Sequence, residues 1–260
     1  MNQPGDRPSE AAAEASAGPR RDGRADLHIH TRFSDGWPGP VEVVRRARRL
    51  GLDVIAIADH DTIEGALWAA EYASRLGKGR PEIIVGEEVS TRHGHVVGLF
   101  LEKRIRPGLS AAATVTAIHE QGGIAFAPHP FWRTTQPRRQ RTRPRGAHGV
   151  GWLAGELDFD AIEVDNSTPG FHLINQLALR LNEEARRAPL GNSDAHILDA
   201  IGRSYSTFPG RSAADLRRAI EDGKTQPHAL RYPALALLRY AAWGLDHRRQ
   251  RRAAAGRRSA

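Results

Sequence analysis

The chain has 260 residues, of which 40% are hydrophobic and none is cysteine. This length suits one large domain or two small ones, and the apolar fraction is sufficient for a packed core, which excludes wholesale disorder. The lack of cysteine excludes disulfides, zinc–thiolate sites, iron–sulfur clusters and a thiol nucleophile. Any bound metal must therefore be held by His, Asp or Glu.

The formal net charge of +8 is confined to two segments. Residues 131–150 contain six arginines and no acid, and residues 248–260 contain six more arginines and no acid. Without these twelve arginines the chain has a formal charge of −4. The two patches are therefore the candidates for contact with an anionic partner.

The chain contains no run of 18 apolar residues, so we expect no membrane-spanning helix and no stable membrane insertion. The first 24 residues lack the apolar stretch of a secretory signal, which favours a cytoplasmic protein. Composition predicts a disordered tail over residues 1–23, a folded domain over 24–228, an apolar terminal helix over 229–247 and an arginine-rich tail over 248–260. The oligomeric state has no signature in the sequence.

Short apolar runs alternate with amphipathic stretches from residue 24 onward. The apolar runs predict strands at 25–30, 53–59, 82–90, 95–101, 123–129, 161–166, 188–193 and 204–208. The amphipathic stretches predict helices near 40–50, 62–76, 110–121, 170–187 and 212–222. Pro40 and Gly51 bracket the first helix, and Asp61 with Glu64 indicates a capping box for the second. This alternation favours a parallel sheet covered by helices, and the number of units favours a barrel.

Nearly every predicted strand ends in ionisable residues. His28 and His30 alternate with apolar neighbours, so they share one face of the first strand. Acids and histidines also follow the other strands, as in Asp59-His60-Asp61 and Asp194-Ala195-His196. In a β/α barrel the carboxyl ends of the strands face one mouth, where so many buried polar groups need a compensating charge. The pattern predicts bound cations, and imidazole with carboxylate ligands suits Mn²⁺, Fe²⁺ or Zn²⁺ better than Mg²⁺ alone.

Six motifs, taken together and in order, carry a resemblance to a known family. They are DLHIHTRFSDG at 26–36, ADHDT at 58–62, GEEVST at 86–91, HVVGL at 95–99, PHP at 128–130 and GNSDAH at 191–196. Over residues 24–228 the chain resembles the polymerase and histidinol phosphatase (PHP) domain, of the stand-alone phosphoesterase or exonuclease type. The resemblance implies a distorted (βα)7 TIM-like barrel, an α/β fold with a site for three divalent metals.

The resemblance also implies a ligand set. The first metal would take His28, His30, Glu88 and Asp194; the second a bridging Glu88 with His95 and His129; the third Asp35, His60 and His196. Every one of these positions holds a residue that can bind metal, and Glu87 would point to the opposite face from Glu88. The short stretch between His95 and His129 implies that the insert domain of many exonuclease-type members is absent. Asp165 stands where an aromatic residue is common, which leaves the substrate open.

The ligand set predicts a metal-dependent hydrolase that cleaves phosphate esters with a hydroxide bridging two metals. Asp194 is the predicted proton acceptor, and Glu88 the bridging catalytic ligand. Arg203 is a candidate for holding a substrate phosphate, with an ordinary surface arginine as the alternative. Asp59 and Asp61 are candidates for orienting imidazoles. The serines of the motifs, Ser34, Ser90 and Ser193, are expected to make turn hydrogen bonds.

The loop after His129 begins with Trp132 and Arg133 and continues with five more arginines. Aromatic and arginine side chains beside a phosphoesterase site favour a nucleic-acid or nucleotide substrate over a small metabolite. The leading prediction is a 5′–3′ exonuclease or a nucleoside bisphosphate phosphatase. The alternatives are a small-metabolite phosphatase, such as a histidinol-phosphatase, and a nucleic-acid-binding module with structural metals. The C-terminal arginines fit RNA binding, anionic lipid or plain solvation.

Overall fold

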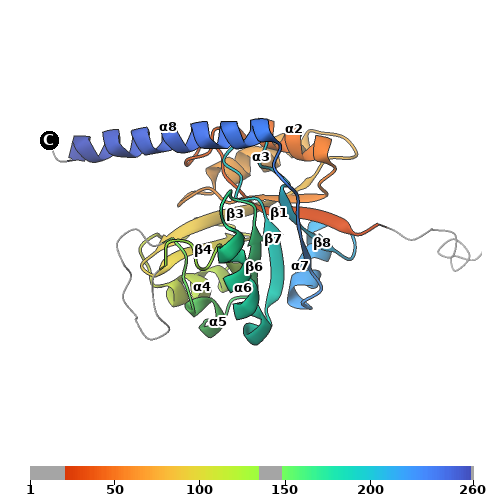
Figure 1. The fold of residues 1–260 in the computed structure, drawn as a ribbon. Coiled ribbons are helices and arrows are strands. Elements are labelled where there is room, and N and C mark those ends of the chain that lie inside the picture. The colour runs from red at the N-terminus through yellow and green to blue at the C-terminus, as the bar shows by residue number, and fades with distance from the viewer. Residues whose placement is uncertain (1–20, 135–147, 259–260) are drawn as a thin grey trace, which may run out of the picture.

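The structure of the chain is a computed structural model that describes residues 21–134 and 148–258 (Figure 1). Its strands are β1 (Gly23–Ile29), β2 (Val54–Ile57), β3 (Glu82–Thr91), β4 (Gly94–Leu99), β5 (Ile124–Ala127), β6 (Ala161–Asn166), β7 (Ala188–Asn192), β8 (Ser204–Phe208) and β9 (Gln226–Ala229). Its helices are α2 (Pro40–Leu50), α3 (Glu64–Ser74), α4 (Ala111–His119), α5 (Leu153–Glu156), α6 (His172–Ala185), α7 (Ala213–Glu221) and α8 (Ala234–Arg258). The predicted disordered tail up to residue 20 and the loop arginines 138–145 lie outside the described residues.

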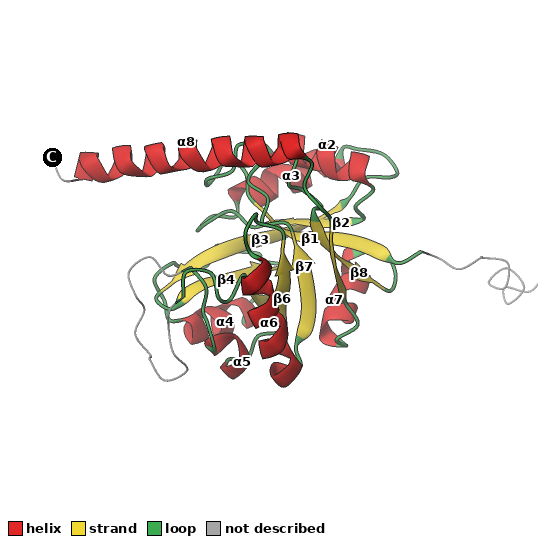
Figure 2. Ribbon diagram, viewed as in Figure 1, coloured by secondary structure: helices red, strands yellow, loops and turns green. Residues whose placement is uncertain are grey.

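The strands form one sheet that is nearly closed into a barrel, with helices around it (Figure 2). The strand order is β7-β6-β5-β4-β3-β2-β1-β8-β9. A parallel bridge between Ile29 and Ala195 joins the end of β1 to the segment that follows β7. The chain therefore has the predicted α/β class and barrel shape.

The prediction of a parallel sheet is confirmed at four strand pairs and wrong at four others. Pairs β3–β4, β4–β5, β1–β8 and β8–β9 are antiparallel. Only Arg92 and His93 separate β3 from β4, and so short a connection permits a hairpin but no crossover helix. Neither β9 nor the short α5 was expected, since neither carries a clear apolar period.

The predicted start of the second helix is also wrong. The residue that precedes the first turn of α3 is Ile63, and it makes no side-chain cap. Asp61 has a left-handed backbone with φ of 55°, and its Oδ1 accepts a hydrogen bond of 2.7 Å from the Ser90 amide. Asp61 therefore joins the loop after β2 to β3 instead of capping a helix. The first helix begins and ends as predicted, at Pro40 and at Gly51 with φ of 67°.

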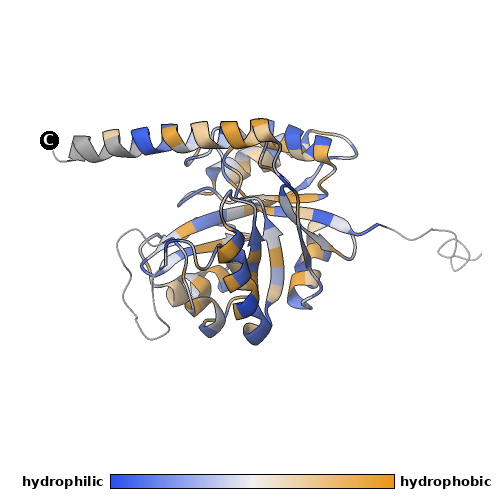
Figure 3. Cartoon of the chain, viewed as in Figure 1, coloured by the Kyte–Doolittle hydropathy of each residue, from blue (hydrophilic) through white to orange (hydrophobic). Residues whose placement is uncertain are grey.

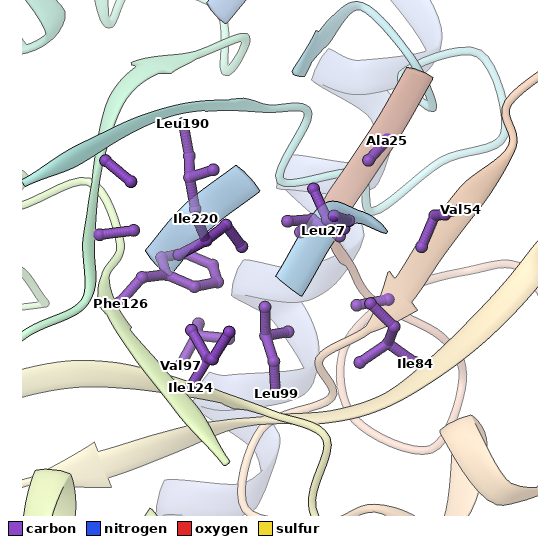
Figure 4. Packing of buried hydrophobic residues seen from close by; sticks show 14 of the residues in the cluster. Ala25, Leu27, Val54, Ile84, Val97, Leu99, Ile124, Phe126, Leu190 and Ile220 are labelled. Carbon is purple, nitrogen blue, oxygen red and sulfur yellow. The ribbon is translucent and has the colours of Figure 1, made fainter. Parts of the chain in front are cut away.

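The centre of the barrel is filled by apolar side chains from most strands and from α7 (Figure 4). Leu27 of β1, Phe126 of β5 and Leu190 of β7 lie in this cluster and have no exposed surface. Ile220 of α7 packs into the same cluster. The barrel is thus a solid core, and a binding site must lie at one of its ends.

Helix α8 runs along one side of the molecule and projects beyond it (Figure 1). Its residues are mainly apolar in the first half and polar further on (Figure 3). The predicted apolar helix ended at residue 247, but α8 continues as one helix through the arginine-rich segment to Arg258. Arginine and alanine are both good helix formers, so the change in polarity does not end the helix. No described helix, α8 included, is both long and apolar enough to cross a bilayer.

A pair of leucine variants tests the barrel core. Leu27→Ala should lower the free energy of unfolding by about 2–5 kcal/mol, because it leaves a cavity among residues that cannot collapse to fill it. The matched control is Leu173→Ala at the start of α6, where the side chain is 70% exposed and the expected change is below about 0.5 kcal/mol. Urea denaturation measures both, and equal losses would contradict the assignment of Leu27 to the core.

Candidate metal centre

The nine predicted ligands lie together at one end of the barrel. His28 and His30 come from β1 and the residue after it, and both side chains are fully buried. The other seven line a pocket of about 780 Å³: Asp35, His60, Glu88, His95, His129, Asp194 and His196. The segments that carry them are separated by up to 168 residues, yet all lie within or after strands of the same sheet.

Glu88 is the centre of the cluster. Its Oε1 lies 2.7 Å from Nδ1 of His95 and 3.0 Å from Nε2 of His129. Its Oε2 lies 3.3 Å from one ring nitrogen in each of His28, His30 and His60. One carboxylate is therefore shared by five imidazoles. Glu87 points away, and its Oε2 accepts a hydrogen bond of 2.7 Å from the amide of Ile105.

Two aspartates complete the cluster on its other side. Asp194 Oδ1 lies 3.2 Å from Nε2 of His30, and 3.6 Å from ring nitrogens of His28 and His196. Asp35 lies 3.2 Å from Nε2 of His196 and 3.7 Å from ring nitrogens of both His30 and His60. The carboxylates and imidazoles thus alternate around a continuous set of donor atoms.

The donor atoms fit divalent cations. They form four groups whose atoms lie within 4.8 Å of one another: His30-Asp35-His60-His196, His28-His30-Glu88, His28-His129-Asp194 and His60-Glu88-His95. Among the described residues, both ring nitrogens of His30 and Nδ1 of His60 and of His129 are buried without a hydrogen-bond partner. Buried polar atoms without partners are costly, and metal coordination would satisfy them.

Burial and mutual attraction set the charges of the cluster. Burial disfavours charge on Glu88 and Asp194, but the surrounding histidines outweigh it and hold the pKa of both carboxyls well below the usual range. Burial likewise opposes charge on His30, yet the nearby carboxylates of Asp194 and Glu88 raise its pKa to about 10. At His60 burial prevails and lowers the pKa to about 4. The ionised carboxylates therefore attract positive charge, which protons or metal ions can supply in competition.

Glu163 of β6 supports the ligands without joining them. Its Oε1 lies 3.0 Å from Nδ1 of His28, and its Oε2 accepts a hydrogen bond of 2.7 Å from the amide of His129. Asn166 and Asn192 donate to the two oxygens of this buried carboxylate at 2.8 and 3.0 Å. Such a partner fixes the ring orientation of a ligating histidine. The only mark of Glu163 in the sequence is an acid inside an apolar strand, which is too weak a pattern to assign it to the site.

Two further buried aspartates hold the loops that carry ligands. Asp59 accepts hydrogen bonds from the amide and hydroxyl of Thr31, at 2.7 and 2.6 Å, and from Ser34 Oγ at 2.6 Å. Asp26 accepts from the amide and hydroxyl of Ser193, at 3.0 and 2.6 Å. Asp59 therefore acts on the loop of Asp35 rather than on an imidazole. Ser34 and Ser193 were expected to make hydrogen bonds within their turns, but their hydroxyls donate to aspartates 25 and 167 residues away in the chain.

The backbone at two ligands is strained. His129 and Asp194 have positive φ values of 27° and 49°. This region costs an ordinary residue free energy, and it is retained where surrounding contacts over-determine the conformation. Each strained residue is the second residue after a strand, and its side chain lies in the cluster.

The rim of the pocket includes two of the three predicted substrate-binding residues. Trp132 and Arg133 line it, with the Arg133 guanidinium 5.5 Å from the centre of the Trp132 ring. His148, which the sequence did not mark, stacks on Trp132 with ring centres 4.3 Å apart. His148 also meets the ring of His95 edge-on, so it connects the rim to the ligands.

Arg203 lies elsewhere. Its guanidinium donates hydrogen bonds to the carbonyl oxygens of Asp199 and Arg231, at 3.0 and 3.2 Å, and it packs over Tyr232. It is not among the residues that line the pocket. Backbone carbonyls hold this side chain in place, so its position does not support the predicted phosphate contact.

Comparison with known proteins agrees with this site. A PHP domain model matches residues 26–144, and a PHP-associated model matches residues 172–225. The chain is 33% identical to the uncharacterized protein MJ1587 of Methanocaldococcus jannaschii over 60% of the chain and 89% of that protein. It is 44% identical to a 5′-3′ exoribonuclease of Haemophilus influenzae over 30% of the chain and 29% of the enzyme. It is 38% identical to a 3′,5′-nucleoside bisphosphate phosphatase of Chromobacterium violaceum over 38% of the chain and 39% of the enzyme.

The fold agrees as well. A two-domain protein of Bacteroides vulgatus, described as containing a PHP-like metal-dependent phosphoesterase, superposes with a TM-score of 0.63 at 23% identity, over 81% of this chain and 65% of that one. The site and fold define the class of metal-dependent phosphoesterases. The chain belongs to the PHP family within that class. It spans less than two-fifths of the length of each of the two curated enzymes above.

The contacts of Glu163 predict a measurable effect on metal affinity. Glu163→Gln should weaken binding of at least one divalent ion by about 10–100-fold, because a neutral amide holds His28 and His129 less firmly. Equilibrium dialysis against Mn²⁺ with elemental analysis measures this. The matched control is Glu87→Gln, another buried carboxylate that faces away from the ligands and should leave affinity unchanged. A Mn²⁺ binding isotherm of Glu163→Gln that matches the wild type would contradict the role of Glu163 in holding His28 and His129.

Proposed function

We propose that the chain hydrolyses phosphodiester or phosphomonoester bonds of nucleic-acid ends or nucleotides, as a 5′–3′ exonuclease or a nucleoside bisphosphate phosphatase. One observation carries the proposal: the metal-ligand cluster and the aromatic and arginine side chains of Trp132 and Arg133 line the same pocket. We further propose that the cluster holds three divalent ions, drawn from Mn²⁺, Fe²⁺ and Zn²⁺, on the nine ligands named above.

Asp194 is the residue best placed to take a proton. Divalent ions in such a cluster lower the pKa of water and neutralise the charge of phosphate oxygens. Asp194 lines the pocket, and its Oδ2 receives hydrogen bonds from Asn166 Nδ2 at 3.2 Å and from Thr168 Oγ1 at 3.4 Å. These contacts fix the carboxylate. The surrounding histidines outweigh its burial and hold its pKa well below the usual range, so it is ionised, as the acceptor of a proton must be.

The rim supports a substrate that carries both a base and a phosphate. A pocket of about 780 Å³ lies in the range of sites for nucleotide-sized molecules. An arginine beside a tryptophan offers charge to a phosphate and a flat surface to a base. The relatives named above as an exoribonuclease and a bisphosphate phosphatase share hydrolysis of nucleotide phosphates, which favours this substrate class over other phosphate esters.

The role of Asp194 predicts a loss of activity. In metal-reconstituted protein, Asp194→Asn should lower kcat for bis-p-nitrophenyl phosphate by at least about 100-fold, because the amide can neither accept the proton nor bind metal as an anion. The control Asp222→Asn alters an exposed acid paired with Lys224 and should retain full activity. Full activity of Asp194→Asn would show that another group accepts the proton.

A product assay tests the substrate. Metal-reconstituted protein should release mononucleotides from the 5′ end of labelled RNA or DNA, or inorganic phosphate from a nucleoside bisphosphate, faster than phosphate from histidinol phosphate. Faster turnover of histidinol phosphate would favour a small-metabolite phosphatase. Tight oligonucleotide binding with no hydrolysis of any substrate would favour a nucleic-acid-binding module with structural metals.

A further inference from the structure

Helix α8 lies outside the segments that match the family models, yet it reaches the metal centre. The two models end at residues 144 and 225, before α8 begins at Ala234. Four polar or aromatic residues of α8 nevertheless line the pocket: Tyr240, Trp243, His247 and Arg248. One wall of the site is therefore built by a segment that the matched family models do not include.

A column of stacked rings connects the barrel interior to this helix. The rings of His30 and His196 stack with centres 4.3 Å apart and an angle of 18° between planes. Trp243 packs against His196 at 4.2 Å and 39°, and His247 stacks on Trp243 at 5.4 Å and 23°. The column begins with two metal ligands and ends with two residues of α8.

Hydrogen bonds tie the same helix to the loop that carries Asp35. Trp243 Nε1 donates to the carbonyl oxygen of Asp35 at 2.8 Å. Trp37, two residues further along the loop, donates from Nε1 to Asp246 Oδ2 at 3.1 Å and from its amide to the carbonyl oxygen of His196 at 2.9 Å. The backbone of Asp35 is thus held between α8 and the segment of His196.

The leucines of α8 contribute little to its docking. Leu235, Leu238 and Leu245 are 57%, 69% and 55% exposed. The face that meets the body instead carries Ala236, which is buried, and the aromatic residues Tyr240 and Trp243. Contacts with the ligand-bearing segments are therefore a large part of what holds α8 in place.

We propose that Trp243 is a positioning residue for Asp35 and His196, and that docking of α8 is coupled to divalent metal binding at this end of the cluster. The inference rests on the metal centre of the proposed function. A metal ion on Asp35 and His196 orders the surface on which Trp243 packs, and a docked Trp243 holds these two ligands in place for the ion. Linkage makes the coupling reciprocal, so each event strengthens the other to the same degree.

The test measures metal affinity without substrate. Equilibrium dialysis against Mn²⁺ compares the wild type with Trp243→Ala, Trp243→Phe and Leu238→Ala. Trp243→Ala should weaken the affinity of one class of sites by about 10–100-fold, since residues that orient ligands have effects of this size. Trp243→Phe keeps a ring against His196 but loses the hydrogen bond to Asp35, so it should recover part of the loss. Leu238→Ala changes an exposed residue of the same helix and should match the wild type.

Hydrogen exchange supplies a second readout. Removal of metal from the wild type by a chelator should speed exchange of the α8 amides between residues 236 and 248, and in Trp243→Ala this exchange should be fast with or without metal. Two results would overturn the coupling: a Trp243→Ala variant that binds Mn²⁺ as tightly as the wild type, or α8 amides that exchange at the same rate with and without metal. If Trp243→Ala does not fold, Trp243→Phe decides: unchanged affinity in this variant overturns the hydrogen-bonding role of Trp243.

The coupling of α8 to metal binding and the proposed phosphoesterase activity can be overturned by different results. A wild type that binds divalent metal but cleaves none of the phosphate esters overturns the proposed function and leaves the coupling to be judged by the isotherms. A wild type that binds no divalent metal overturns both.

Discussion

The charge of Glu88 is the constraint on which the site depends. Its carboxylate is 1% exposed and lies within 3.3 Å of a ring nitrogen in each of five histidines. A buried anion of this kind is unfavourable unless positive charge or hydrogen-bond donors surround it on all sides. Protonated imidazoles can supply that charge, but divalent ions supply more of it and also satisfy the buried ring nitrogens that make no hydrogen bond. The geometry of the barrel end is thus adapted to cations.

The acids around the site, all of them buried except the partly exposed Asp35, divide into two groups that make different contacts. Glu88, Asp194 and Asp35 contact imidazole nitrogens and offer oxygens to a metal. Asp26, Asp59 and Glu163 accept hydrogen bonds from backbone amides and side chains of the segments that hold the ligands. The second group keeps the ligands in position while the strained backbone of His129 and Asp194 would otherwise relax.

The predicted ligand set came from the resemblance of the six motifs to the PHP family, and strand geometry gave a separate reason to expect these side chains at one end of the barrel. His28 and His30 share a face through strand alternation. Glu88 lies within β3 and His95 near the start of β4, and the remaining predicted ligands follow strands at the same end of the barrel. No comparable pattern in the sequence marks contacts that depend on packing between distant segments. Trp243 bonds to Asp35 across 208 residues of chain, and His148 reaches His95 from the end of a loop. The predicted capping box at Asp61 was wrong for the same reason. The Asp61 side chain accepts a hydrogen bond from the amide of Ser90, which is distant in the sequence, and so does not cap the helix.

The placement of arginines shows how an anionic substrate could enter a pocket that is rich in acids. Arg133 lines one part of the rim beside Trp132 and His148, and Arg248 lines another beside Trp243 and His247. The acids within would repel a phosphate if they stood alone, because charges in a poorly hydrated site interact more strongly than charges at the surface. On the proposed function, metal ions reverse that field at the floor of the pocket while the arginines attract at its rim. Metal loading, which we propose is coupled to α8, would then control both the chemistry and the affinity for phosphate.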